Sequence, residues 1–315
     1  MGKIAFVFPG QGAQAVGMGK DAFESCEASR AIFEQADEAL GFKLSGIIFE
    51  GPDEELKKTY NTQPALLTTS VALYEAFRSA GVSPDYVAGH SLGEYSALVI
   101  AGALSFEDAV RTVRARGEFM EQAVPNGQGA MAAVLGAERD ALTRLCADIS
   151  GTAGVVEPAN MNCPGQIVVS GSKEGVQAFV ERGKEAGAKR VIPLEVSGPF
   201  HSSLMKPASE KLSAELGKAD IKPAQIPVVA NVSARPVTDP AQIRELLVEQ
   251  VYSPVLWEDS VSWLIAEGVD TFVEIGSGTV LAGLIKKIDK SVKTVSINSV
   301  EAIEQFIAAN AEAKA

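Results

Sequence analysis

The sequence predicts an α/β fold in which a parallel-sheet core is interrupted by a small α+β insert. Two observations lead to this prediction. Near both ends of the chain, short apolar segments typical of buried strands are each followed by a segment with helical spacing, an alternation that favours a parallel sheet. Between them, residues 127–195 follow the order strand, helix, strand, strand, helix, strand, which is the ferredoxin-like pattern. A chain of 315 residues is long enough for both parts.

Three buried strands are predicted for the core, each followed by a helix. Pro9 and the Gly- and Gln-rich loop behind it end the first strand, and the loop Gly276-Ser277-Gly278 ends the third. The predicted strands are residues 3–8, 85–88 and 271–275, and the helices after them are residues 21–40, residues 92–103 and a segment that ends at Ile288.

The insert is predicted to have its own sheet. Its strands are expected at residues 130–135, 155–156, 166–170 and 190–194, and its helices at residues 138–149 and 173–186. Glycines at 127–129 and prolines between 193 and 199 mark the junctions. We therefore expect a core of residues 1–126 and 196–315 and a ferredoxin-like subdomain of residues 127–195. The cleft between two such parts is a common location for ligand sites.

Composition narrows the class of protein. The net charge of −12 argues against nucleic-acid binding. No apolar segment is long enough to span a membrane, and the apolar run at the N-terminus is too short for a signal peptide, so a cytoplasmic protein is expected. Cys26, Cys146 and Cys163 have no metal-ligand spacing and are too few for a disulfide framework, which predicts free thiols and no metal site.

The segment Gly89-His90-Ser91-Leu92-Gly93 matches the G-x-S-x-G pattern of a nucleophile elbow. It lies between a predicted strand and a predicted helix, which is the structural context of a nucleophile elbow. Small residues at Gly89 and Gly93 permit the sharp turn that exposes the Ser91 hydroxyl. The N–H of Leu92, at the start of the helix, can then stabilise an oxyanion. The alternative is a glycine-rich turn with an ordinary N-cap serine.

A serine nucleophile needs a base, and this chain has two histidines. His90 is adjacent to Ser91, so its side chain is expected to diverge from the serine. His201 lies in a turn fixed by Gly198 and Pro199 and is the predicted general base. The group that orients His201 is left open at this point. Candidates are a backbone carbonyl and three downstream carboxylates, those of Asp239, Asp259 and Asp270.

Six motifs occur in an order that closely resembles the bacterial malonyl-CoA:acyl-carrier-protein transacylases of type II fatty acid synthesis. The resemblance runs from Ile4 to about Val300. It implies an α/β-hydrolase-like core with a ferredoxin-like insert. It also implies transfer of a malonyl group from malonyl-CoA to the phosphopantetheine thiol of acyl carrier protein through a malonyl-serine, without a cofactor. The motifs are Phe8-Pro9-Gly10-Gln11-Gly12, Thr62-Gln63-Pro64-Ala65, Gly89 to Glu94, Arg114-Ala115-Arg116-Gly117, Asn160 to Gln166 and Gly198-Pro199-Phe200-His201-Ser202.

The resemblance also implies roles for single residues. Ser91 is the nucleophile and His201 the base. Gln11 supplies a second oxyanion N–H beside Leu92, and the glutamine of Glu249-Gln250 holds His201 through its carbonyl.

Three further side chains are implied to bind or enclose the acyl group. Arg116 corresponds to the arginine that binds the malonyl carboxylate, a task that suits a planar, permanently charged fork. Without the resemblance, Arg116 would be interpreted as part of a solvated helix face with Arg111 and Arg114. Gln63, otherwise a polar residue near a helix start, is expected to line the pocket. Phe200 is expected to narrow it.

The sequence offers two other functions. An α/β-hydrolase such as a thioesterase or esterase places its histidine near the C-terminus, whereas more than a third of this chain follows His201 and no HGGG-type motif occurs. A nucleotide-binding module would need glycine where Ala15 stands in the segment that begins at Gly10. Both alternatives are weaker than acyl transfer.

Carrier proteins of this kind are typically acidic, so local basic clusters are expected to guide docking to this acidic chain. Two clusters are candidates: Lys189-Arg190 at the end of the insert, and Lys286-Lys287 with Lys290 after the last apolar helix. The alternative for both is an ordinary solvated surface.

Overall fold

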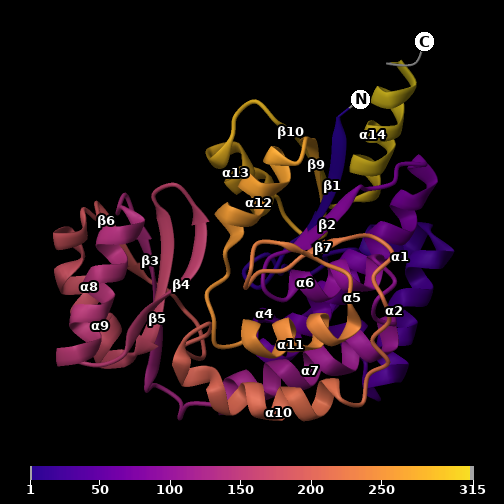
Figure 1. The fold of residues 1–315 in the computed structure, drawn as a ribbon. Coiled ribbons are helices and arrows are strands. Elements are labelled where there is room, and N and C mark those ends of the chain that lie inside the picture. The colour runs from indigo at the N-terminus through magenta and orange to yellow at the C-terminus, as the bar shows by residue number, and fades with distance from the viewer. Residues whose placement is uncertain (1, 313–315) are drawn as a thin grey trace.

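In the computed structural model, which describes residues 2–312, the strands form two sheets, one of six strands and one of four (Figure 1). In spatial order, the strands of the larger sheet are β10 (Lys293–Ile297), β9 (Val269–Ile275), β1 (Lys3–Phe8), β2 (Tyr86–Gly89), β7 (Val228–Val229) and β8 (Pro236–Val237).

Strand β1 lies inside the larger sheet and is parallel to both neighbours. Phe6 is opposite Val87 of β2 and Val273 of β9. Strands β10 and β7 continue the sheet in parallel, and β8 adds an antiparallel edge to β7. Residues 5–8 are fully buried, because a parallel sheet is covered on both faces and its strands are apolar on both sides.

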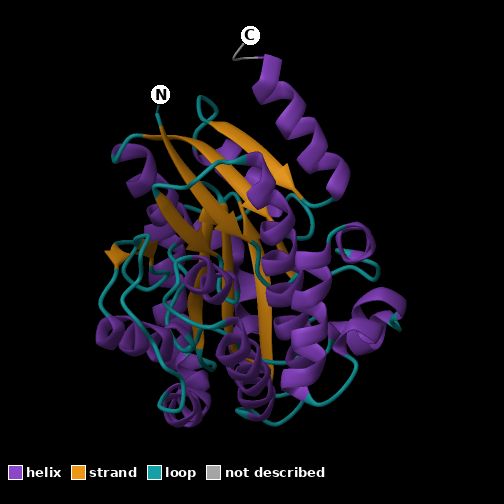
Figure 2. Ribbon diagram, turned by 90° about the vertical axis from the view of Figure 1, so that its right-hand side faces the viewer, coloured by secondary structure: helices purple, strands orange, loops and turns teal. Residues whose placement is uncertain are grey.

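Helices cover both faces of the larger sheet (Figure 2). Side chains alternate along a strand, so Phe6 and Phe8 pack into one apolar cluster, and Ala5 and Val7 pack into another. The cluster on the Ala5 face includes α12 (Trp257–Ala266) and α13 (Val280–Ile288). The cluster on the Phe6 face includes α1 (Lys20–Ser25), α2 (Glu27–Leu40), α3 (Leu44–Glu50), α4 (Asp53–Lys57), α5 (Thr59–Phe77), α6 (Gly93–Ile100), α7 (Phe106–Gln122), α10 (Lys206–Leu216), α11 (Pro240–Gln250) and α14 (Val300–Glu312).

The smaller sheet is antiparallel throughout and has the order β4-β5-β3-β6. Its two helices, α8 and α9, share an apolar cluster with one face of the sheet. The other face carries Met131, Ala133 and Val168 toward the larger part of the molecule, where they line a cavity. The elements are β3 (Gly129–Leu135), α8 (Arg139–Thr152), β4 (Val156–Cys163), β5 (Gln166–Ser172), α9 (Lys173–Arg182) and β6 (Arg190–Pro193).

The two sheets are joined by a few specific contacts. Met161 N of β4 donates to Val255 O at 2.9 Å, and Val255 N donates to Ala159 O at 2.8 Å. Arg139 of α8 forms a two-pronged ion pair with Asp259 of α12. The predicted fold class is confirmed, because a parallel-sheet core carries an insert with the ferredoxin-like order of elements.

Several predicted elements differ from the observed ones at their ends. The helix predicted at 21–40 is two helices, α1 and α2, because Cys26 between them is extended (φ −124°, ψ 119°). The helix predicted at 92–103 ends at Ile100, before a turn through Gly102 at φ 72°. Single 3-10 turns occupy Arg78–Ala80, Gly183–Ala186 and Ser203–Met205. Among residues 2–312, no helix has both the length and the apolar character needed to cross a membrane.

Candidate active site

The turn between β2 and α6 forms the predicted nucleophile elbow. Ser91 stands at its tip with φ 50°, a left-handed conformation that is uncommon for a residue other than glycine. A Cβ at Gly89 would lie 1.9 Å from the backbone of Gly93, and one at Gly93 would lie 2.1 Å from Phe8 O. The turn therefore requires glycine on both sides of the serine. The N–H of Ser91 donates to Asn231 Oδ1 at 2.7 Å, which holds the strained turn in place.

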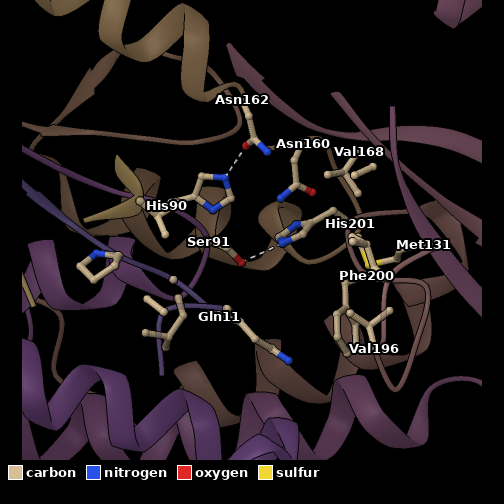
Figure 3. Close-up of a pocket in the computed structure, with 18 of the residues that line it drawn as sticks. Gln11, His90, Ser91, Met131, Asn160, Asn162, Val168, Val196, Phe200 and His201 are labelled. Atoms are coloured by element: carbon tan, nitrogen blue, oxygen red, sulfur yellow. Dashed lines mark hydrogen bonds between the residues drawn. The ribbon is translucent and has the colours of Figure 1, made fainter. Parts of the chain in front are cut away.

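His201 reaches Ser91 from a distant part of the chain. Its Nε2 lies 2.7 Å from Ser91 Oγ (Figure 3). Its Nδ1 lies 2.8 Å from the backbone carbonyl of Gln250. A carbonyl oxygen can only accept, so Nδ1 carries the proton and Nε2 is free to accept the proton of the serine. Burial, and then the charge of Arg116, lower the pKa of His201 to about 3, so the imidazole is neutral and ready to act as a base.

The group hydrogen-bonded to Nδ1 is a carbonyl, and none of the three candidate carboxylates hydrogen-bonds to the histidine. Asp239 caps α11 by accepting from Gln242 N, and Asp259 pairs with Arg139. Asp270 accepts from the adjacent Thr271 hydroxyl. The carbonyl of Gln250 belongs to the last residue of α11, where the helix dipole is negative and would favour a protonated imidazole.

Arg116 projects from α7 into the interior and is 1% exposed. Its Nη1 donates to Gln63 Oε1 at 2.7 Å, and its Nη2 donates to Gln250 Oε1 at 2.9 Å and to Ser91 Oγ at 3.1 Å. All of these acceptors are neutral, and no ion pair to Arg116 occurs within residues 2–312. A buried guanidinium without a counter-ion, beside a serine hydroxyl, is a site for an anionic group.

The solvated-face interpretation of the three arginines is wrong for Arg116. Arg111 and Arg114 do lie at the surface side of α7, where they pair with Glu107 and Glu118. Arg116 lies on the other side of the helix, because positions two and five residues away along a helix do not share its face.

Gln63 does not line the cavity, contrary to the expectation from the resemblance. It lies inside α5, is 1% exposed, and stands behind Arg116. Its contact with the pocket is indirect, because its amide oxygen fixes one arm of the guanidinium fork.

A cavity of about 420 Å³ opens above Ser91, between the core and the insert. Gln11 and Leu92 line it on the core side, and neither backbone N–H donates to another described residue. Both are therefore free to face an oxyanion. Phe200 of the core and Met131 of the insert line the cavity beside His201, together with other apolar residues (Figure 3). The wall is mostly apolar, with polar groups gathered at the serine, as in a typical ligand pocket.

Two asparagines of β4 also face this cavity, and they were not predicted individually. Asn162 Oδ1 lies 2.8 Å from Nε2 of His90, whose ring points toward it and away from Ser91 (Figure 3). Asn160 Oδ1 is buried without a hydrogen-bond partner in the described part of the chain. Both residues belong to the motif Asn160 to Gln166, one of the six on which the family resemblance depends. Their place in that motif is the sequence signal that could have identified them as site residues.

The mouth of the cavity is lined by exposed apolar side chains from both parts. Val280, at the start of α13, is 53% exposed, and Leu194, just after β6, is 37% exposed. In residues 2–312, no three His, Cys, Asp or Glu side chains are grouped so that they could hold a metal ion.

Comparisons with known proteins agree with this geometry. A model of the acyl transferase domain family matches residues 5–305. A malonyl CoA-acyl carrier protein transacylase of Bacillus subtilis is 59% identical, over 98% of this chain and 97% of the relative. The crystal structure of an acyl carrier protein S-malonyltransferase of Vibrio cholerae is 45% identical with a TM-score of 0.93, over 96% of this chain and 99% of the other.

A third match is a complex. It contains a type II PKS acyl-carrier protein with its malonyl-transacylase, and the transacylase chain is 41% identical to this one. Its TM-score is 0.94, and the similarity covers 98% of this chain and 100% of the other.

Proposed function

The chain belongs to the acyl transferase family, and we propose that it transfers a malonyl group from malonyl-CoA to acyl carrier protein by way of Ser91, in the service of fatty acid synthesis. The observation that carries this proposal is the position of Arg116. A buried positive charge without a carboxylate partner lies 3.1 Å from the hydroxyl that would receive the acyl group. A malonyl thioester brings its own free carboxylate to that charge, whereas an acetyl thioester does not.

In the first half-reaction, Ser91 Oγ attacks the thioester carbonyl of malonyl-CoA while His201 Nε2 accepts the hydroxyl proton. The negative charge that develops on the carbonyl oxygen is stabilised by the N–H groups of Leu92 and Gln11. The C–S bond then breaks, and His201 returns the proton to the sulfur, so that CoA leaves as a thiol. The product is malonyl-Ser91.

In the second half-reaction, the pantetheine thiol of the carrier enters the same channel and gives its proton to His201. The thiolate attacks malonyl-Ser91 through a second oxyanion at the same two N–H groups. The ester bond breaks and the proton passes from His201 to Ser91 Oγ, which restores the free enzyme. The arm is long and carries amides, and Asn160 Oδ1 is available to accept from one of their N–H groups.

The malonyl carboxylate replaces Ser91 Oγ as a partner of the guanidinium. Gln63 and Gln250 hold two of the guanidinium N–H groups, and the fork is thus aimed into the cavity. Phe200 and Met131 line the cavity, and we expect them to enclose the short malonyl chain.

The similar proteins support transfer, not hydrolysis: the relatives are named transacylases and S-malonyltransferases, and one matched structure holds a carrier protein. The thioesterase alternative has no comparable support.

The same proposal includes the division of the chain and its place in the cell. Residues 1–126 and 196–315 form the catalytic core, and residues 127–195 form the subdomain that closes the cleft. The second sheet, β3 to β6, supports these boundaries because it begins at Gly129 and ends at Pro193. We propose a cytoplasmic enzyme that needs no cofactor.

The test uses malonyl-CoA labelled in the malonyl group. The enzyme alone should become labelled to at most one malonyl per chain, and the label should move to holo-carrier protein when this is added. The carrier without its phosphopantetheine arm is the control, and it should remove nothing. Release of the label as free malonate at the same rate with and without carrier would contradict transfer and favour the thioesterase.

A further inference from the structure

Behind the serine lies a network of buried polar groups that centres on a carboxylate, Glu94. The residue is in the first turn of α6 and is 2% exposed. Its Oε2 accepts from the backbone N–H of Asn231 at 3.0 Å and from Nε2 of Gln250 at 2.9 Å. Glu94 forms no ion pair with another described residue. Burial raises the pKa of its carboxyl group to about 7, although the hydrogen bonds from Asn231 and Gln250 and the charge of Arg116 act in the opposite direction. Burial of a carboxyl group without an ion-pair partner is energetically unfavourable, so its presence here suggests a specific role.

Glu94 thus binds the backbone N–H of Asn231 and the side-chain amide of Gln250, and these two residues reach all three parts of the site. Asn231 accepts from Ser91 N at 2.7 Å and donates to Gly89 O at 2.7 Å, so it supports the elbow. The Nε2 of Gln250 also donates to Ser91 O at 3.0 Å. The Oε1 of Gln250 accepts from Arg116 at 2.9 Å, and its backbone carbonyl orients His201.

From these contacts we infer that Glu94 is a positioning residue, whose carboxyl group fixes the backbone of Asn231 and the side-chain amide of Gln250 and thereby aligns Ser91, His201 and Arg116 with one another. The inference rests on the proposed function. Glu94 touches neither substrate nor reacting atom, and it acts through its neighbours.

The coupling between Glu94 and Arg116 depends on the orientation of the Gln250 side-chain amide. Its NH2 end faces three acceptors: Glu94 Oε2, Ser91 O and Asn231 Oδ1. Its oxygen end faces the guanidinium of Arg116. A reversed amide would turn donors toward the donors of Arg116, so the acceptors around Nε2 hold the amide the right way round.

The side-chain amide of Gln250 lies between the Glu94 carboxyl group and the Arg116 guanidinium, and this arrangement has a consequence for selectivity. A direct ion pair between Glu94 and Arg116 would compete with the malonyl carboxylate for the same N–H groups. With Gln250 in between, the carboxylate steadies the arginine while the guanidinium stays open to an anionic substrate.

The test compares Glu94→Gln with Glu94→Ala. In Glu94→Gln, the amide oxygen can take the place of Oε2 and keep both hydrogen bonds, so most of the activity should remain. In Glu94→Ala, the Asn231 N–H loses its acceptor and Gln250 loses one of three. We expect acylation of Ser91 by malonyl-CoA to slow by about tenfold to a hundredfold, together with a fall in the preference for malonyl-CoA over acetyl-CoA.

Glu274 is the matched control. It is 1% exposed, and its carboxylate accepts from the N–H groups of Leu281 and Ala282, at the start of α13. It contacts neither Asn231 nor Gln250. Glu274→Gln should leave the malonyl-to-acetyl ratio as it is, even where the melting temperature changes.

The outcomes separate this inference from the proposed function. Wild-type enzyme that forms no malonyl-Ser91 by intact mass defeats the proposed function itself. Wild-type enzyme that forms the adduct, with folded Glu94→Ala that forms it equally fast and with the same acyl preference, defeats the positioning role alone. Equal losses in Glu94→Gln and Glu94→Ala would also overturn it, because the charge rather than the hydrogen bonds would then matter.

Discussion

The floor of the cavity and its mouth are built in opposite ways. At the floor, Ser91 is hydrogen-bonded to both His201 and Arg116, each of the three is hydrogen-bonded to Gln250, and Arg116 and His201 are almost fully buried. At the mouth, Val280 and Leu194 are exposed and apolar. The floor is arranged for one chemical step on one acyl group, whereas the mouth is a surface that can receive a long flexible arm and its carrier.

The floor also stores backbone strain that the mouth does not need. Ser91 and His201 both have positive φ, at 50° and 58°. Such conformations cost about 1–3 kcal/mol each and persist only when the surroundings fix them. Asn231 binds the backbone of Ser91, and Val251 O accepts from His201 N at 3.2 Å. Changes at the floor should therefore alter chemistry and acyl choice, and changes at the mouth should alter partner affinity.

The largest expected effect is at the nucleophile. Ser91→Ala should abolish the malonyl-enzyme, because no other hydroxyl is bonded to His201 in residues 2–312. Intact-protein mass spectrometry after incubation with malonyl-CoA measures the adduct directly. A variant that still gains one malonyl mass would remove Ser91 from the mechanism.

The next effect concerns acyl choice at Arg116. Arg116→Ala removes a charge-assisted pair with the malonyl carboxylate, which costs on the order of 2–5 kcal/mol in a site of this kind. Malonyl transfer should therefore fall by a factor of about thirty to several thousand, while transfer from acetyl-CoA is kept or gained. The measurement is the ratio of kcat/KM for the two thioesters. An unchanged ratio would mean that Arg116 does not bind the carboxylate.

The third test is the pH dependence of Ser91 acylation. The expected direction follows from the pKa of His201, which is lowered from 6.5 to about 3. A histidine of ordinary pKa would be mostly protonated at pH 5, and acylation would slow by about thirtyfold relative to neutral pH. With a pKa near 3 the base stays neutral, so acylation at pH 5 should show no such loss from this group. Single-turnover acylation of Ser91 between pH 5 and pH 8 measures it.

The same shift affects stability in a defined direction. Below pH 6.5 the unfolded chain protonates His201, and the folded chain does so only near pH 3. The contribution of His201 to stability is therefore complete above about pH 6.5 and is lost as the pH falls toward 3. A thirtyfold loss of acylation at pH 5 in protein that remains folded would contradict the buried, neutral base.

The sequence predicted the parts of this molecule that depend on local signals. Strand β1 was predicted with its observed bounds, because an apolar run there is cut off by Pro9. The order of elements in the insert was also predicted from local signals, namely its succession of strand-like and helix-like segments. Strands β7 and β8 were missed because two residues carry no periodicity, and β10 was missed because its burial is only partial.

The nucleophile and its base could be predicted from the sequence, whereas the buried residues that support them could not. The elbow has a local motif, and His201 stood out because the chain has two histidines. The burial of Arg116, and the positions of Glu94 and Asn231, depend on contacts between residues far apart in the chain. Glu94 and Asn231 are separated by 137 positions, and no local pattern pairs them.

The smallest expected effect is at the two basic clusters predicted for carrier docking. Lys287 of α13 reaches Gln166 Oε1 of β5 at 3.3 Å, and so lies at the junction of core and insert. Arg190 is exposed at the start of β6. Lys286 is less suitable for reversal, because its ammonium group binds the carbonyls of Lys290 and Val292 and supports their loop.

Lys287→Glu and Arg190→Glu should each raise the KM for carrier protein by about two- to fivefold, the size expected for one exposed charge. Acylation of Ser91 by malonyl-CoA should stay the same, since both side chains lie outside the floor. At high salt, the difference in KM between each variant and the wild type should become smaller, because salt screens the electrostatic attraction between the wild-type enzyme and the carrier. Lys222→Glu, at an exposed lysine of neither cluster, is the matched control. Carrier kinetics that respond to all three reversals alike would indicate net charge alone, and kinetics indifferent to the first two would place the docking surface elsewhere.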